Sequence, residues 1–245
     1  MEIIKSELLS KYENIIFGIS TKIGLERAKP FYFNLSYNVG DKLDQVNENR
    51  NYFYSLLGIR SSQVAHQKQI HSEIISIIDQ PGLHGESDAM ITIENNLGLA
   101  ISTADCASIF IYDYAQKIIA AVHSGWRGSQ KQIVRKTLNK LVFDFNSKPE
   151  NLLVYIGPSI TQKNYEVGIE VAELFSDKYI LELENKFFLD VILVNLDLIK
   201  AFDIPDKQIE VSQLCTFEEN KLLHSYRRDG QKSGRALGII YMKKN

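Results

Sequence analysis

The chain has 245 residues, of which 44% are hydrophobic and 24% charged, and its formal net charge is -2. This composition is typical of a soluble globular protein, and the near-neutral charge argues against nucleic acid or an anionic membrane as a partner. No apolar run approaches the roughly 18 residues that a membrane-spanning helix needs. With two cysteines, no disulfide framework and no signal-type apolar core at the N-terminus, the expected location is a reducing cytoplasm.

The first half of the chain is rich in short apolar runs and contains one helical pattern. Residues 45–57 are predicted to form a helix, and Gly58 follows it at the position of a helix-terminating glycine. One face of that helix carries Arg50, which is typical either of a side chain extended along the core edge or of an anion-binding group. Predicted strands cover residues 14–20, 62–70, 73–78, 89–93 and 97–102, the last two as a hairpin around 94–96.

The second half of the chain alternates between helical and extended patterns. Apolar residues recur at helical spacing over residues 128–145, and two further helices are predicted at 167–175 and 191–202, the last with Asp190 as its N-cap. Residues 151–156 and 208–212 read as strands, and 236–242 as a strand or a helix. Because no linker, repeat or low-complexity stretch interrupts these elements, we predict one mixed α/β domain over residues 1–245, with central β-sheets flanked by helices.

A predicted hairpin in the middle of the chain places a thiol beside an imidazole. Residues 107–112 and 117–122 are its two strands and 113–116 its turn, so that Cys106 and His123 lie together at its open end. Three interpretations remain open: a cysteine nucleophile with a histidine base, two ligands of a metal, or a buried cysteine beside a locally bonded histidine.

A metal at this position needs at least one more ligand. His71 is the best candidate because it follows a predicted strand in the same β-rich half. His66 lies five residues earlier, and on a regular strand it would face the other way. Asp105, next to Cys106, could orient a ligand or merely end a strand. A His/Cys/His set would leave a fourth zinc position open, which is the pattern of a catalytic site.

Motifs spread along the chain resemble the YfiH family, which is also called the polyphenol oxidoreductase laccase or purine nucleoside phosphorylase family and includes the human protein FAMIN. The resemblance extends from about Phe17 to about Arg235. The motifs, in order, are Gln69-Ile70-His71, Ser87-Asp88-Ala89, Thr103-Ala104-Asp105-Cys106, His123-Ser124-Gly125-Trp126-Arg127-Gly128, Gly157-Pro158-Ser159-Ile160, Tyr165-Glu166-Val167, and Ser225-Tyr226-Arg227-Arg228-Asp229-Gly230 with Gly234-Arg235.

The resemblance implies a fold related to the cytotoxic-necrotizing-factor-like cysteine hydrolases and a metal, usually zinc, held by His71, Cys106 and His123. It also implies phosphorolysis of adenosine, inosine, guanosine and methylthioadenosine, with adenosine deamination in the same site. Purine nucleosides and phosphate would then be the partners, and no protein partner is implied. Two positions depart from the family pattern: Ser72 stands where glycine is common, and Ser159 where many members carry cysteine.

Both reactions need side chains beyond the three metal ligands. A carboxylate would move protons during deamination, and Asp88 and Glu166 are the candidates, beside Cys106 and His123 in the catalytic set. Phosphorolysis needs a site for an anion, and the available arginines could equally be solvated surface residues. The candidate substrate-binding residues are Asn34, Arg50, Tyr165, Arg227 and Arg228.

Three other functions remain as alternatives. A copper-dependent polyphenol oxidase is one, because copper binds a His/Cys/His site more strongly than zinc does. The chain has only five histidines in all, which argues against a true multicopper oxidase. The second alternative is a metal-free amide hydrolase that uses Cys106 and His123, and the third is a nucleotide sensor without catalysis.

Overall fold

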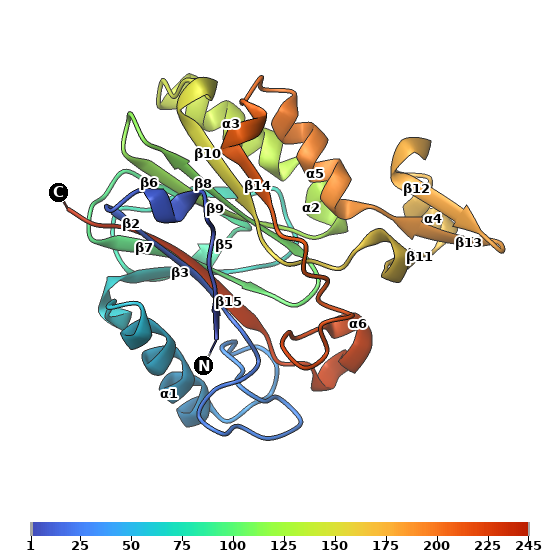
Figure 1. The fold of residues 1–245 in the computed structure, drawn as a ribbon, viewed down its shortest axis with the longest axis horizontal. Coiled ribbons are helices and arrows are strands. Elements are labelled where there is room, and N and C mark those ends of the chain that lie inside the picture. The colour runs from blue at the N-terminus through green and yellow to red at the C-terminus, as the bar shows by residue number, and fades with distance from the viewer. Residues whose placement is uncertain (1, 245) are drawn as a thin grey trace.

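Two six-stranded sheets form the centre of the computed structural model, which describes residues 2–244 (Figure 1). The first sheet has the order β1 (Ile3–Ile4), β2 (Ile15–Ser20), β15 (Ala236–Met242), β7 (Leu97–Thr103), β3 (Val64–Lys68), β5 (Gly82–Glu86). The second has the order β14 (Ile209–Val211), β10 (Leu152–Ile156), β8 (Ala107–Asp113), β9 (Ile118–Ser124), β6 (Ala89–Thr92), β4 (Ile75–Ile77).

The two sheets pack face to face, and helices cover their outer faces. Phe17 of β2 packs edge-on against Phe110 of β8 and Tyr155 of β10, with ring centroids 4.9 and 5.0 Å apart. Helix α1 (Leu43–Leu56) packs against the outer face of the first sheet, and α3 (Ile133–Asp144) and α5 (Val191–Lys200) pack against the second (Figure 1). Strands β8 and β9 are buried along their whole length, because both of their faces are covered.

Most of the predicted elements are present in this mixed α/β fold, and the differences have physical reasons. The hairpin of β8 and β9 is confirmed, with Ser108 opposite His123. The second predicted hairpin is wrong: β6 and β7 lie in different sheets, and the short connection between them crosses from one layer to the other. In sequence, a tight crossover between stacked sheets looks the same as a hairpin turn, since both join two apolar runs through a few polar residues.

The predicted helices differ from the observed ones mainly at their ends. The predicted helix over residues 128–145 is two helices, α2 (Trp126–Gln130) and α3, because Gln132 adopts a left-handed conformation with φ 59°. The helix predicted at 167–175 was wrong in extent, since only α4 (Ile169–Ala172) forms there. Asp190 caps α5 as expected, accepting the Leu193 N–H at 2.8 Å.

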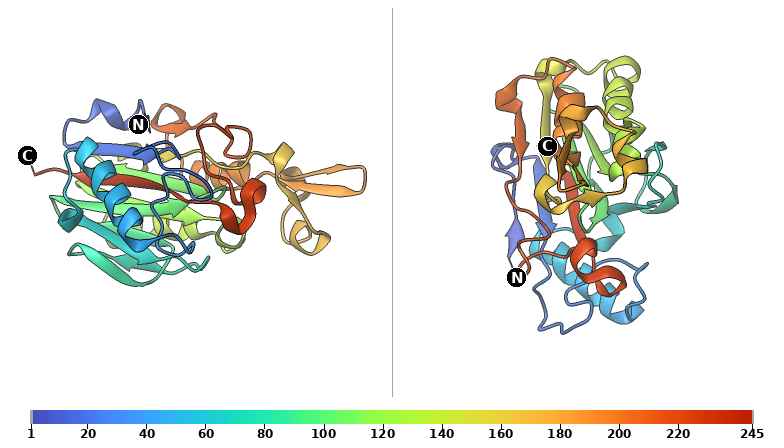
Figure 2. Two further views of the ribbon diagram at one scale, coloured as in Figure 1. Left: turned by 90° about the horizontal axis from the view of Figure 1, so that it is seen from below. Right: turned by 90° about the vertical axis from the view of Figure 1, so that its right-hand side faces the viewer.

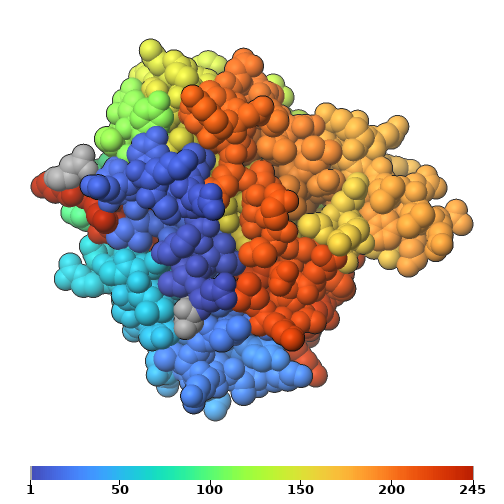
Figure 3. All heavy atoms as spheres, viewed as in Figure 1, coloured from blue at the N-terminus to red at the C-terminus, as the bar shows by residue number. Residues whose placement is uncertain are grey.

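A third, small sheet projects from the body as an arm (Figures 1 and 2). It consists of β11 (Glu166–Val167), β13 (Lys186–Leu189) and β12 (Ile180–Leu183), and the sequence patterns assigned no strand to these residues. On another face, the N-terminal segment and the segment that contains β14 lie side by side (Figure 3). Glu210 joins them by accepting the Ser6 hydroxyl at 2.6 Å and the Leu8 N–H at 2.8 Å. No helix in the described part of the chain combines the length and apolar character needed to cross a membrane.

Candidate metal centre

His71, Cys106 and His123 come together where the two sheets meet. Each offers one ligand atom, and these atoms all lie within 4.8 Å of one another. Cys106 precedes β8 and His123 lies near the end of β9, so the hairpin register brings them together. His71 follows β3 of the first sheet in a left-handed turn with φ 57°. The centre therefore depends on the stacking of both sheets.

Asp88 ties two of these residues together from behind. Its Oδ1 lies 2.8 Å from Nδ1 of His123 and accepts the backbone N–H of His71 at 3.1 Å, and its Oδ2 accepts the N–H and hydroxyl of Ser72 at 2.6 and 2.8 Å. Burial alone would raise the pKa of Asp88, but the bonds from His123 and Ser72 outweigh it and lower that pKa to about 2. The ionised carboxylate keeps the proton of His123 on Nδ1, and Nε2 is left to face the cluster.

The donor set and the space between the donors fit a zinc ion. Burial opposes ionisation of Cys106, but His123 and His71 outweigh it and lower the pKa of the thiol, which favours the thiolate that a metal binds. A Cβ on Gly125 would lie 2.7 Å from Sγ of Cys106 and 3.0 Å from Nδ1 of His71, so only glycine leaves this space free. Two imidazoles and one thiolate match the three-ligand zinc site of an enzyme.

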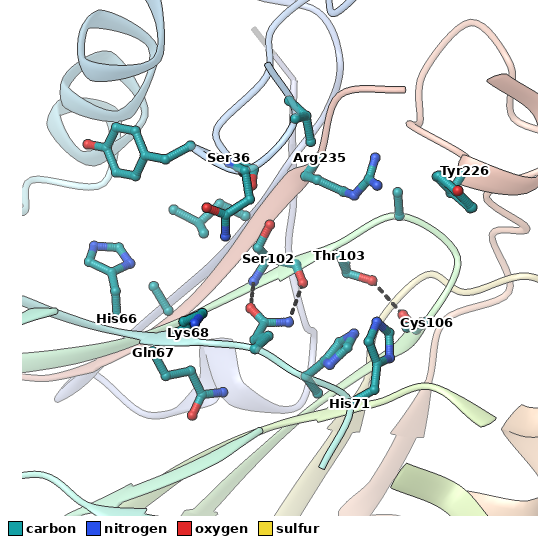
Figure 4. Close-up of a pocket in the computed structure, with 18 of the residues that line it drawn as sticks. Ser36, His66, Gln67, Lys68, His71, Ser102, Thr103, Cys106, Tyr226 and Arg235 are labelled. Atoms are coloured by element: carbon teal, nitrogen blue, oxygen red, sulfur yellow. Dashed lines mark hydrogen bonds between the residues drawn. The ribbon is translucent and has the colours of Figure 1, made fainter. Parts of the chain in front are cut away.

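A cavity of about 630 Å³ extends from the cluster along the outer face of the first sheet (Figure 4). His71 and Cys106 lie at one end of it, and His66 lies at the other. The residues that line it include Arg50, Lys68 and Arg235 but no aspartate or glutamate. The cavity is therefore suited to a ligand that carries negative charge.

Arg50 is the most deeply placed of these cations, with only 9% of its surface exposed. Its Nε–H donates to the Leu35 carbonyl at 2.7 Å, and its guanidinium carbon lies 4.1 Å from the ring centroid of Tyr37. One terminal nitrogen lies 3.4 Å from Nε2 of His66. Burial, reinforced by the charge of Arg50, lowers the pKa of His66 to about 3, so this imidazole is neutral at pH 7. Arg50 forms no ion pair with any carboxylate among residues 2–244.

Arg235 lies nearer to the cluster, and in the sequence only its place in the last motif distinguishes it. It donates to the carbonyls of Ser233 and Gly234 at 2.7 and 3.0 Å, and its guanidinium carbon lies 5.2 Å from the ring centroid of Tyr226. Tyr226 and Arg235 both line the cavity, and Figure 4 shows them on the side opposite His66. The Gly234-Arg235 pair in the motif was the only signal in the sequence that could have identified this cation.

Six candidate residues lie outside the cavity. Asn34 is fully buried, and its side chain organises the backbone of Ser36 and Arg235. The guanidinium of Arg228 donates to the carbonyls of residues 216, 217 and 223, which fixes a loop. The candidates outside the cavity lining are Asn34, Asp88, Tyr165, Glu166, Arg227 and Arg228.

Arg227 contacts Tyr165 and Glu166 at the base of the arm. Arg227 donates to the Glu166 carbonyl at 2.7 Å and lies over the ring of Tyr165. The carboxylate of Glu166 is exposed and pairs with Lys186 at 3.1 Å. Asp88 also does not line the cavity, because it lies behind His123. Of the predicted substrate-binding arginines, the structure places only Arg50 in the cavity.

Comparisons with known proteins identify the family of the chain. The family model for multi-copper polyphenol oxidoreductase laccase matches residues 17–243. A purine nucleoside phosphorylase of Bacteroides thetaiotaomicron is 33% identical over 258 residues, covering 97% of this chain and 95% of that protein. The YfiH purine nucleoside phosphorylase of Escherichia coli is 28% identical over 230 residues, covering 91% and 92%.

Solved structures show the same fold. YlmD from Geobacillus stearothermophilus superposes with a TM-score of 0.91 at 25% identity, covering 98% of this chain and 94% of that one. The Bacillus licheniformis protein YfiH gives a TM-score of 0.90 at 29% identity, covering 94% and 93%. The chain therefore belongs to the YfiH family, the family described as multi-copper polyphenol oxidoreductase laccase.

Proposed function

We propose that this protein is a zinc-dependent purine nucleoside phosphorylase. One observation carries the proposal: the His71, Cys106 and His123 cluster lies at one end of a cavity lined by three cations and no carboxylate. A phosphate ion matches the positive lining, and a nucleoside beside it could reach the metal cluster at the end of the cavity. The names of the relatives support the same reaction, since they are called purine nucleoside phosphorylases.

In the proposed phosphorolysis, the cations that line the cavity bind the phosphate, and the metal cluster lies at one end. A phosphate oxygen forms a bond to C1′ of the ribose as the bond from C1′ to the purine nitrogen breaks, and the purine leaves with that electron pair and takes up a proton. Arg50 and Arg235 bind the phosphate and hold its charge against the positive charge that develops on the sugar. When bound, zinc supplies a Lewis acid that lowers the pKa of water toward ~7.

Adenosine deamination in the same cavity is the second part of the proposal. Water replaces the amino group at C6 and ammonia leaves, which requires proton transfers at the purine. Asp88 is buried behind His123, and Glu166 lies outside the cavity, so neither carboxylate reaches the substrate directly. We therefore expect deamination to be slower than phosphorolysis. Because Cys106 must stay reduced to bind zinc, a reducing cytoplasm is the compartment we propose.

The test is product analysis of adenosine incubated with zinc-quantified protein, with and without phosphate. We expect adenine and ribose 1-phosphate only when phosphate is present, together with a smaller amount of inosine. His71→Ala should abolish all products, whereas His84→Ala, a histidine outside the ligand set, should not. Absence of turnover with adenosine, inosine, guanosine and methylthioadenosine, despite one bound zinc per chain, would contradict the proposal.

A second candidate function, amide hydrolysis, rests on the arrangement of Cys106, His123 and Asp88. A thiol, an imidazole and a carboxylate in this order can also serve an amide hydrolase, with Cys106 as nucleophile and His123 as base. The two functions separate cleanly: alkylation of Cys106 would stop both, but removal of zinc with a chelator would stop only phosphorolysis. A non-catalytic nucleotide sensor would instead bind purines saturably without any turnover.

Polyphenol oxidation is disfavoured by the number of metal-binding groups. Residues 2–244 bring together one such cluster, of three residues, whereas multicopper chemistry requires several copper sites. Copper bound at the zinc position could still oxidise phenols weakly, because copper binds such ligands more tightly. We expect any oxidase activity to follow copper content and to disappear when the protein is loaded with zinc alone.

A further inference from the structure

Asp105 connects the candidate metal centre to the C-terminal residues that line the cavity, Tyr226 and Arg235. We propose that Asp105 is a positioning residue, whose carboxylate holds helix α6 (Tyr226–Asp229) against the segment of Cys106 and so places Tyr226 and Arg235 for binding of the phosphate. This inference rests on the proposed function and assigns a task to a residue that contacts neither substrate nor metal.

The backbone of Asp105 is held in an uncommon conformation. Its φ is 86°, in the left-handed region that non-glycine residues rarely adopt, and only 7% of the residue is exposed. Its carbonyl accepts the Ser159 hydroxyl at 2.7 Å and the Ile160 N–H at 3.0 Å. The loop that follows β10 therefore fixes one side of this residue, and the side chain is turned toward the C-terminal segments.

Both oxygens of the Asp105 carboxylate are bound by groups more than 100 residues away in sequence. Oδ1 accepts the Thr216 hydroxyl at 2.6 Å, and Oδ2 accepts the backbone N–H of Arg227 at 2.6 Å. Arg227 lies in the first turn of α6, where N–H groups have no partner inside the helix. The carboxylate thus serves as an external acceptor for this short helix, and short charge-assisted bonds of this kind are strong.

Helix α6 transmits the position of Asp105 to the cavity. Tyr226 is its first residue and lines the cavity, and the guanidinium of Arg235 lies over the Tyr226 ring. If α6 loosens, both the tyrosine and the arginine lose their fixed positions. Asp88 holds His71 and His123, and the Thr103 hydroxyl donates to the Cys106 carbonyl at 2.6 Å, so the zinc should remain. A variant that loosens α6 should therefore bind substrate more weakly while it keeps its zinc.

Thr216→Val tests this arrangement because it removes one donor to Asp105 at almost constant side-chain volume. We expect KM for phosphate to rise about tenfold, corresponding to ~1.4 kcal/mol. The value of kcat should stay within about threefold, and zinc should stay at one per chain. Asp105→Asn should act in the same direction, and Thr216→Ser, which keeps the hydroxyl, should restore KM. Thr161→Val is the matched control, since the Thr161 hydroxyl donates to Cys215 at 3.2 Å and not to Asp105.

Amide hydrogen exchange gives a second readout that does not depend on turnover. Peptides covering residues 225–230 should exchange faster in Thr216→Val and Asp105→Asn, while those covering 107–113 should keep the parent rate. This result would stand even if the parent cleaved no purine nucleoside, so it separates this inference from the proposed function. Parent-like exchange and KM in both variants, or loss of zinc with unchanged KM in the loaded fraction, would overturn it.

Discussion

Nδ1 of His123 lies 2.8 Å from Oδ1 of Asp88, and the same oxygen accepts the backbone N–H of His71 at 3.1 Å. One buried carboxylate therefore fixes two histidines that come from different sheets, since His71 follows β3 and His123 belongs to β9. It sets the tautomer of one histidine and the turn that carries the other. Asp88 should accordingly act on metal affinity although it does not line the cavity beside the cluster.

Asp88→Asn should weaken zinc binding about 10- to 100-fold, the usual effect of losing a carboxylate behind a ligating histidine. The asparagine amide oxygen can still accept a hydrogen bond, but the substitution removes the negative charge that holds the His123 proton on Nδ1. Competition with a chromophoric chelator measures the change. Asp113→Asn is the control, because Asp113 is equally buried but bonds only to the turn of the β8–β9 hairpin. Equal zinc affinity in the two variants would contradict this role for Asp88.

Gly125→Ala should empty the metal site by crowding it. The new Cβ would lie 2.7 Å from Sγ of Cys106, closer than real contacts allow, and a tight 3.0 Å from Nδ1 of His71. We expect less than about a tenth of the parent zinc content by elemental analysis, with activity falling in proportion. Gly85→Ala places its Cβ in open space and should retain zinc. Full zinc occupancy in Gly125→Ala would show that the ligands do not need this gap.

The centre of the site could be predicted from sequence because a hairpin has few possible geometries. Two short apolar runs joined by four residues pair in one way, and this alone brings Cys106 next to His123. The position of His71 could be anticipated only by elimination and resemblance, because it depends on how the two sheets stack. The wrong hairpin between β6 and β7 has the same origin: local patterns do not report which sheet a strand joins.

The walls of the cavity were less predictable. Arg227 and Arg228 stand together in a motif, yet backbone contacts occupy both side chains, whereas Arg235 lies in the cavity. The difference arises from the direction in which each side chain leaves a short helix or a strand end, and no periodicity encodes that direction at a loop. Arg50 was placed correctly among buried residues by helical spacing, but the sequence left its role undecided between core edge and anion binding.

Arg50→Lys should raise KM for phosphate with little change in kcat. Lysine keeps the positive charge but loses the planar fork that lies over Tyr37 and donates to the Leu35 carbonyl. A hydrogen bond to a charged group is worth ~1.5–3 kcal/mol, so we expect KM to rise about 10- to 100-fold. Steady-state kinetics at saturating nucleoside measures the effect. Arg60→Lys, at an exposed position, should match the parent. A parent-like KM in Arg50→Lys would exclude Arg50 from phosphate binding.

Two histidines, the half-buried His66 in the cavity and the buried His224, should make the fold sensitive to acid. Burial lowers the pKa of both His66 and His224 to about 3, from an ordinary value of 6.5. Between these values the unfolded chain binds more protons than the folded one, so the free energy of unfolding must fall as the pH falls. The contribution of the two neutral histidines to the free energy of unfolding is complete above pH 6.5 and is lost progressively toward pH 3. Each histidine contributes a slope of up to about 1.4 kcal/mol per pH unit once the unfolded histidine is protonated.

His66→Gln removes one of these groups and should remove about half of the acid sensitivity that His66 and His224 contribute. Urea unfolding between pH 7.5 and 5 measures the slope, in excess chelator so that zinc release at His71, Cys106 and His123 does not add to it. Glutamine can still accept the Tyr54 hydroxyl, which lies 3.1 Å from Nε2 of His66, so the variant should fold. His84→Gln, on an exposed strand, should keep the full parent slope. An unchanged slope in His66→Gln would mean that His66 can take up a proton within the folded protein, for example by turning toward solvent in the cavity.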